Sequence, residues 1–405
     1  MTATTSPSFT PGGGAAWASP WAMYAGLRDH DPVHHVVPRG RPHDDYYVLS
    51  RHEDVLRAAV DTDTFSSARG LTVEYGELEK IGLADNPPMV MLDPPEHTAF
   101  RRLVSRGFTP RAVREIEPDV RRFVAARLDA FVVSGGGDIV VELFKPLPSM
   151  VVAHYLGVPA EDRDRFDGWT DAIVAASSAG DPTGAADATA AMLGYFSELI
   201  ERRRREPAED RGDDTVSHLV AAGVGDDDAG LLSILGYVFA MVTGGNDTTT
   251  GALGGAVQLL AARPDQRALL AADPGLLGSA VEEFLRLTSP VQGLARTVTR
   301  DVELHGVTVP AGRKVLLCYA AANRDPRKYG ADAERLDVRR HPTQILTFGQ
   351  GNHHCIGNAA ARLMVRVALE ELLARIPSFT IDLDGVTWAP GRYVRRPLTV
   401  PLAAA

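Results

Sequence analysis

The chain has 405 residues, of which 45% are hydrophobic and 23% charged, proportions typical of a globular protein with a large core. Its formal net charge of -10 argues against a nucleic-acid backbone or an anionic membrane as the main partner. Two cysteines, Cys318 and Cys355, are too few for a disulfide-stapled secreted scaffold, so the composition favours a reducing, cytoplasmic setting.

Residues 1–16 carry neither a basic segment nor an apolar stretch, so we expect a flexible lead and no signal peptide or membrane anchor. The pattern over residues 46–65 predicts a strand followed by a helix. Residues 87–131 predict a Pro-rich loop and then two helices separated by a turn at Thr109–Pro110, and the glycines at 135–137 should end the second helix.

Residues 163–206 predict two helices joined by a connection of small residues at 177–188, which makes this region a candidate lid. The charge-dense segment 202–214 is predicted to be a solvated loop. The aspartates at 226–228 are suited to cap a long apolar helix. Its most apolar part, residues 231–243, is shorter than the roughly 20 residues of a membrane span, so we predict a buried helix.

Short alternating runs with Gly and Pro predict small sheets near residues 302–325 and 379–400. No internal repeat or linker divides the chain. We therefore predict a mainly α fold with small β-sheets, and a single domain over residues 17–405.

The stretch FGQGNHHCIG, residues 348–357, places Cys355 between histidines and glycines. A lone cysteine is usually a small buried hydrophobe. A zinc site with His353 and His354 is disfavoured because adjacent side chains cannot easily converge on one tetrahedron. A nucleophilic Cys–His pair is possible but leaves the glycines and Phe348 unexplained. A haem-iron thiolate accounts for all of these residues, and the strong helix predicted after Cys355 is expected to favour a thiolate at or just before its N-terminus.

This stretch resembles the haem-binding signature of cytochromes P450, F-x-x-G-x-x-x-C-x-G, matched at Phe348, Gly351, Cys355 and Gly357. The resemblance covers nearly the whole chain. It implies a triangular-prism fold with haem b between a long distal helix and the proximal helix that follows the cysteine, and it makes Cys355 the iron ligand. It assigns the other haem contacts to His97, Arg101, Arg296, His353, Phe348, Gly349 and Gly357.

The sequence TGGNDTTTG, residues 243–251, is similar to the distal-helix motif of the same family, matched at Gly244, Gly245, Asp247 and Thr248. Taken alone, the two glycines could be a packing notch. Activation of dioxygen in an apolar pocket needs protons, so a hydroxyl and a carboxylate at this place are suited to a relay. The glycines are expected to leave room for oxygen and water, and Gly at 244 departs from the more common Ala.

Glu283 and Arg286 match the family's E-x-x-R, and the resemblance adds Arg340 as the third member of a structural triad. On its own, this spacing more often marks a solvated salt bridge. Leu336 and Val338 replace the more common Phe and Pro of the later segment, which makes the match moderate.

By resemblance, the protein is a monooxygenase (EC 1.14 class) that uses O2 to hydroxylate or epoxidise a lipophilic small molecule, with a role in secondary metabolism. A steroid, fatty acid, terpenoid or polyketide would fit a pocket with apolar walls. Those walls are expected near residues 71–91, 166–195, 238–245 and 291–294. The residues placed in them are Met89, Val90, Met241, Val242, Val291 and Leu294.

No flavin- or nicotinamide-binding region accompanies the domain, so electrons are expected from a separate ferredoxin and its reductase. A basic face for that partner is predicted from Arg102, Arg106, Arg362 and Arg366. The alternatives are a peroxide-driven oxidation, a non-oxygenating rearrangement, or a haem-thiolate sensor or carrier that does not turn over.

Overall fold

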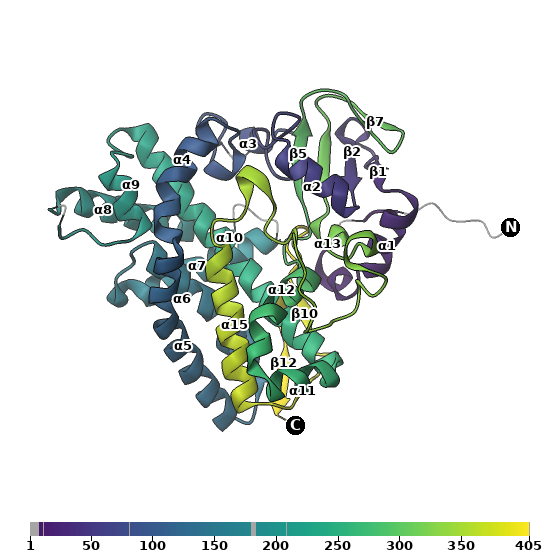
Figure 1. Cartoon of the computed structure of the whole chain (residues 1–405). Helices are drawn as coiled ribbons and strands as arrows, with labels where there is room; N and C mark the ends of the chain where they lie inside the picture. Colours follow the sequence, from purple (N-terminus) through teal and green to yellow (C-terminus); the bar gives the residue numbers. More distant parts are fainter. Residues whose placement is uncertain (1–7, 11, 81, 180–183, 208, 405) are drawn as a thin grey trace.

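The computed structural model describes residues 8–10, 12–80, 82–179, 184–207 and 209–404. These residues form a mainly helical molecule with small sheets, as predicted (Figure 1). The helices are α1 Trp21–His30, α2 His52–Val60, α3 Glu77–Lys80, α4 Glu96–Val104, α5 Pro110–Val133, α6 Pro146–Tyr155, α7 Arg163–Ala179, α8 Ala186–Arg205, α9 Thr215–Ala221, α10 Asp228–Ala262, α11 Pro264–Ala272, α12 Leu277–Thr288, α13 Tyr319–Ala322, α14 Pro326–Tyr329 and α15 Asn358–Arg375.

The largest sheet in the described residues has the strand order β1-β2-β8-β5-β3. Strand β2 pairs parallel with β8, and β8 pairs antiparallel with β5, which places Arg296 opposite Val315. Smaller sheets have the orders β4-β12-β9, β10-β11 and β6-β7. The strands are β1 Val33–Val36, β2 Tyr46–Leu49, β3 Phe65–Ser66, β4 Gly137–Asp138, β5 Leu294–Val298, β6 Val302–Leu304, β7 Val307–Val309, β8 Lys314–Leu317, β9 Phe379–Ile381, β10 Thr387–Trp388, β11 Pro397–Thr399 and β12 Pro401–Ala404.

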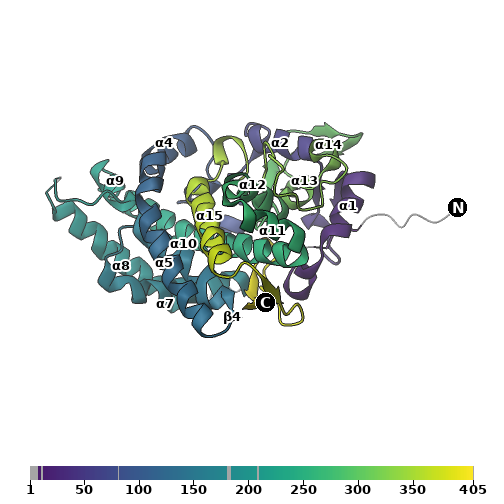
Figure 2. The same cartoon turned by 60° about the horizontal axis from the view of Figure 1, so that its bottom comes forward.

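Helix α10 runs through the middle of the molecule in both views (Figures 1 and 2). It begins where predicted, because the Asp227 side chain accepts a hydrogen bond of 2.8 Å from the Gly230 amide. Within the described residues it is the one helix long and apolar enough to cross a membrane. It packs against α6, α7, α12 and α15, and residues 249–257 are buried throughout, as in a core helix. The prediction of a buried helix over 231–243 holds only in part, because the residues buried there are Ile234, Leu235, Tyr237, Val238 and Val242 and the others are partly buried or exposed.

Two predicted segments differ from the structure. The segment predicted as a solvated loop, 202–214, is helical as far as Arg205, because α8 continues into it, and at its far end Asp214 caps α9 through the Ser217 amide at 2.8 Å. In the predicted lead 1–16, residues 1–7 and 11 lie outside the described residues, but Gly14 opens a 3-10 helix, Gly14–Ala18, and donates a hydrogen bond of 2.9 Å to the Ala389 carbonyl.

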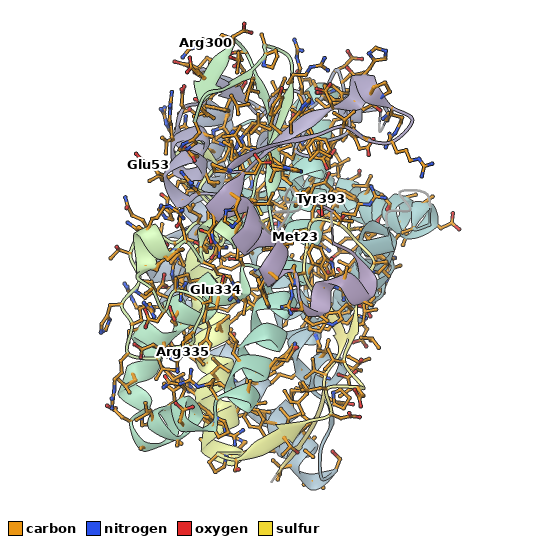
Figure 3. All side chains as sticks on the ribbon, turned by 90° about the vertical axis from the view of Figure 1, so that its right-hand side faces the viewer. Met23, Glu53, Arg300, Glu334, Arg335 and Tyr393 are labelled. Carbon is orange, nitrogen blue, oxygen red and sulfur yellow. The ribbon has the colours of Figure 1, made fainter. Side chains whose placement is uncertain are left out.

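The N-terminal part of the chain packs on residues near the C-terminus. Figure 3 shows Met23 of α1 close to Tyr393, and both side chains pack against the same apolar cluster. Helices α7 and α8 confirm the two helices predicted over 163–206, and residues 180–183 of their connection lie outside the described residues.

Candidate functional site

The Cys355 loop is a tight turn that ends at α15. Gly349 and Gly351 adopt φ angles of 65° and 70°, a left-handed region that favours glycine, as the sequence predicted. A side chain at Gly351 would come within 3.0 Å of the Ala59 carbonyl oxygen. The Cys355 amide donates a hydrogen bond of 2.8 Å to the Phe348 carbonyl, and this closes the turn around the sulfur.

The charge state expected for the Cys355 thiol differs from the prediction. Gly357 is the N-cap of α15, so the cysteine lies before the first helical turn and gains less from its dipole. Burial raises the pKa of Cys355, and the opposing effects of the Gly357 backbone and of Arg101 and Arg362 are smaller. The protein alone therefore favours a thiol, and binding of a metal is what displaces the proton.

Four basic side chains from three segments converge beside the cysteine. His97 and Arg101 come from α4, Arg296 from β5, and His353 from the 3-10 helix Gly351–His353. The two imidazole rings lie 4.1 Å apart between centroids. Burial, followed by Arg296, His97 and Arg101, lowers the pKa of His353 to about 3. The structure thus gathers the basic residues that the sequence analysis placed around haem.

The donor groups of this cluster fit the two carboxylates of a haem. His97 is 1% exposed, and within the described residues both of its ring nitrogens and Nε2 of His353 have no hydrogen-bond partner. Across the same residues, none of the four side chains forms an ion pair with a carboxylate, and the two arginines are cations that call for anionic partners. The nearest atom to a side chain placed at Gly357 would be the Cys355 sulfur at 4.0 Å, so that face is open.

The Phe348 ring lies beside the cysteine loop. It packs against the main core, and the Arg362 guanidinium carbon lies 4.5 Å from its ring centroid. Nη2 of Arg101 donates to the His354 carbonyl, which ties α4 to the loop. These contacts hold the segment around the sulfur between α4 and α15.

The two glycines of α10 have different environments. A side chain at Gly244 would meet no atom within 4 Å, whereas one at Gly245 would lie 2.7 Å from Cγ2 of Val152 on α6. Gly244 therefore leaves open space, and the prediction that Gly245 does so is wrong, since it permits close helix packing. Thr248 Oγ1 donates a hydrogen bond of 2.7 Å to the Gly244 carbonyl.

Asp247 forms an ion pair that the sequence analysis missed. Its Oδ1 lies 2.7 Å from Nε of Arg396, and both side chains are nearly buried. Arg396 precedes β11 and is far from Asp247 in the chain. The sequence around it, VRRPL, carries no signal for this role.

Five of the six predicted pocket residues are partly exposed, and one is not. Val242 is 0% exposed and packs in an apolar cluster with residues of α6, α7 and α8, so the structure does not support it as a pocket wall. The reason is helix geometry, because Val242 points away from the face that carries Gly244. The partly exposed residues are Met89, Val90, Met241, Val291 and Leu294.

The structure brings Glu283, Arg286 and Arg340 together. Arg286 Nε and Nη2 donate to the Glu283 carboxylate at 2.7 and 2.8 Å, and both side chains are 0% exposed. Arg340 Nε lies 3.2 Å from the same carboxylate and its Nη2 pairs with Asp332 at 2.9 Å. The three residues join α12 to the segment after α14.

The predicted basic face is only partly basic. Arg366 pairs with Glu117 at 2.8 Å and with Glu370 at 2.9 Å, and Arg362 pairs with Glu282. Arg102 and Arg106 are exposed and form no ion pair within the described residues. The free positive charge of this face therefore comes from α4 and the turn that follows it.

Comparisons with known proteins agree with this geometry. Residues 275–384 match the family model described as "Cytochrome P450". Cytochrome P450 130 of Mycobacterium tuberculosis is 64% identical over 404 residues, which cover 99% of both proteins. The vitamin D(3) 25-hydroxylase of Pseudonocardia autotrophica is 37% identical over 94% of this chain and 93% of its own.

A solved structure is also similar to this chain over nearly its whole length. CYP109E1 from Bacillus megaterium, solved in complex with testosterone, superposes with a TM-score of 0.81 at 28% identity, over 95% of this chain and 99% of its own. A relative at 64% identity along essentially the whole length shows the family directly. The chain therefore belongs to the cytochrome P450 family, whose members are haem-dependent monooxygenases that use O2 and a redox partner.

Proposed function

We propose that this monooxygenase holds haem b through Cys355 and hydroxylates or epoxidises a lipophilic small molecule in the cytoplasm. The observation that supports this most is the cluster of His97, Arg101, Arg296 and His353 beside the cysteine, in which two arginines lack a carboxylate partner and buried nitrogens of both histidines lack a hydrogen-bond partner within the described residues. When bound, haem supplies the iron and the redox chemistry that activates dioxygen. The chain holds that group, orients the substrate, excludes water and delivers protons.

The roles of the haem-contact residues follow from their chemistry. Arg101 and Arg296 are permanent cations and suit the two propionates, and His97 and His353 can donate hydrogen bonds to the same groups. The low pKa of His353 reflects burial beside cations, so an anion placed in the cluster would raise the pKa again. Gly349 and Gly351 supply the positive φ angles of the turn, and Gly357 leaves the space beside the sulfur open for a flat macrocycle.

We propose a steroid-like substrate. The half-buried side chains of Met89, Val90, Met241, Val291 and Leu294 offer apolar contacts, which suits a ligand with few polar groups. A relative is named for vitamin D(3) hydroxylation, and a similar structure was solved with testosterone. Both names support a rigid, polycyclic or sterol-derived ligand. A similar structure, P450BioI, was solved with hexadec-9Z-enoic acid on an acyl carrier protein, so fatty acids belong in the same test.

The experiment for this proposal combines binding with turnover. Steroids, fatty acids, terpenoids and macrolide polyketides are titrated into the haem-loaded protein, and a shift in its absorption spectrum reports binding. Ligands that bind are then incubated with O2, a ferredoxin and its reductase. We expect the tightest binding and an oxygenated product from the steroid set. Product formed only with peroxide would instead support the peroxide-driven alternative, and binding without any product would support a carrier.

Asp247 is proposed to pass protons toward Thr248. General acid–base groups contribute about 10²–10⁴-fold to rates. We therefore expect Asp247→Asn to lower O2-dependent turnover by about 10²-fold at least. Substrate binding and peroxide-driven turnover should change little, because peroxide brings its own protons. The rate of product formation per haem, measured with O2 plus redox partner and separately with peroxide, checks this, and equal losses in both would show a damaged pocket and not a lost proton donor.

A further inference from the structure

A small cavity lies against the buried side of Asp247. Its volume is about 10 Å³, and its polar lining includes Thr170 and Asp171 of α7 and Asn246 and Asp247 of α10. About one water molecule fits a cavity of this size, provided that polar partners surround it.

Two buried polar atoms of this lining have no partner within the described residues. They are Oγ1 of Thr170, whose residue is 2% exposed, and Oδ1 of Asn246, whose residue is 4% exposed. The Asn246 amide nitrogen donates a hydrogen bond of 2.7 Å to the Val242 carbonyl. This bond fixes the orientation of the side chain and leaves its Oδ1 atom available to accept a hydrogen bond. Buried polar atoms in proteins are almost always hydrogen-bonded to protein or to ordered water. A water in this cavity would satisfy both.

The two ends of the cavity differ in their access to solvent. On the outer side, Lys145 and Asp171 form an ion pair of 2.9 Å, and their side chains are 39% and 53% exposed. On the inner side, the pair between Asp247 and Arg396 has side chains only 9% and 5% exposed. The cavity thus lies between a carboxylate in contact with solvent and the buried carboxylate of α10.

We propose that this cavity binds one ordered water that carries protons from solvent at Asp171 to Asp247, and that Arg396 is a positioning residue for the Asp247 carboxylate. The proposal rests on the proton-delivery role proposed for Asp247. It names the source of the protons, because a buried acid that delivers a proton must regain one.

The proton balance is closed. One turnover consumes O2, two electrons from the redox partner and two protons, and yields oxygenated product and one water. Each proton that leaves Asp247 toward Thr248 is replaced by one from the cavity water, which takes one from solvent at Asp171. The cavity water is therefore a carrier and is not consumed.

A crystal structure of the haem-loaded protein tests the binding of the water directly. We expect an ordered water at about 2.7–3.2 Å from both Thr170 Oγ1 and Asn246 Oδ1. In Thr170→Val, which removes the hydroxyl and keeps the shape, this water should be lost or displaced. A cavity that is dry in the unmodified protein would overturn the proposal.

Kinetics test the proton route. Asp171→Asn should lower O2-dependent turnover several-fold and raise the solvent isotope effect in D2O, while peroxide-driven turnover stays close to normal. Asp164→Asn is the matched control, since Asp164 is an exposed acid of the same helix that does not line the cavity. Asp171 is more than half exposed, so its change to Asn should leave the carbon monoxide spectrum intact even if Thr170→Val does not fold.

The outcomes separate this proposal from the one on which it rests. If Asp247→Asn leaves turnover and isotope effect unchanged, the relay itself is wrong. If Asp247→Asn slows turnover but Asp171→Asn behaves like Asp164→Asn, only the water route is wrong. For Arg396, we expect Arg396→Gln to reproduce the raised isotope effect and Arg396→Lys, which keeps the charge, to restore part of the lost turnover. Equal losses in both variants with an unchanged isotope effect would remove Arg396 from the route.

Discussion

Replacing Cys355 by Ser is expected to abolish the strongly red-shifted absorption band of the reduced, carbon monoxide-bound protein. That band reports a thiolate on the iron. Burial already raises the pKa of the Cys355 thiol, and a serine hydroxyl at the same place is far harder to deprotonate. Monooxygenase turnover should fall by more than about 100-fold, because loss of a ligand exceeds the 10–100-fold cost of outer-shell changes.

Cys318 supplies the control for this experiment. It is 1% exposed, and burial raises the pKa of its thiol to about 12, so it is an inert core residue. Cys318→Ala should keep the red-shifted band at full intensity per haem. A band that survives in Cys355→Ser, or one that is lost equally in Cys318→Ala, would mean that Cys355 is not the axial ligand.

What could be predicted from the sequence was mostly local. The turn around Cys355 follows from glycines that must adopt positive φ, and the start of α10 follows from an aspartate at its cap. Glu283 and Arg286 lie one helical turn apart, so their contact needs no knowledge of the fold. Each of these features depends on residues within about ten positions of one another.

Most of the incorrect or missed predictions depend on contacts between residues that are far apart in the chain. Whether Gly245 opens space or closes on Val152 depends on where α6 packs. Arg366 pairs with Glu117 of α5, which is far away in the chain, and also with Glu370, a local i,i+4 partner that the sequence could have shown. The partner of Asp247 comes from the segment before β11, and no local pattern connects the two. Val242 is different, since helical periodicity alone already separates it from the face of Gly244.

The pKa of Cys355 shows how burial can reverse a local argument. A helix N-terminus lowers the pKa of a nearby thiol, but that effect falls off within the first turn. Desolvation acts on the whole side chain and here exceeds it. A site that binds a metal through a thiolate can therefore be a neutral thiol until the metal arrives.

Removal of the Glu283 carboxylate is expected to have the largest effect on stability. Arg286 would remain fully buried, with its charge no longer compensated by a partner. Breaking a buried pair in this way costs about 3–5 kcal/mol, a large part of the 5–15 kcal/mol that stabilises a typical domain. We expect Glu283→Ala to unfold at much lower urea concentration and to retain little haem.

The adjacent residue gives a matched control. Glu282 lies on α12 beside Glu283 and pairs with Arg362 of α15, with side chains 26% and 32% exposed. Pairs near the surface contribute about 0–1 kcal/mol. Glu282→Ala should therefore shift the urea midpoint only slightly. A shift as large as that of Glu283→Ala would indicate that truncation of α12 side chains, and not a buried charge, causes the loss.

The double variant Glu283→Leu/Arg286→Leu separates charge from hydrogen bonding. Replacing both members of a buried pair by apolar residues is often neutral, whereas removing one is costly. If uncompensated charge dominates, the double variant should be more stable than Glu283→Ala. Arg286 also donates to the Asn323 and Ala333 carbonyls at 2.6 and 2.7 Å. A double variant no better than the single one would therefore show that these hydrogen bonds, which join α12 to the segments around α13 and α14, hold this part of the fold together.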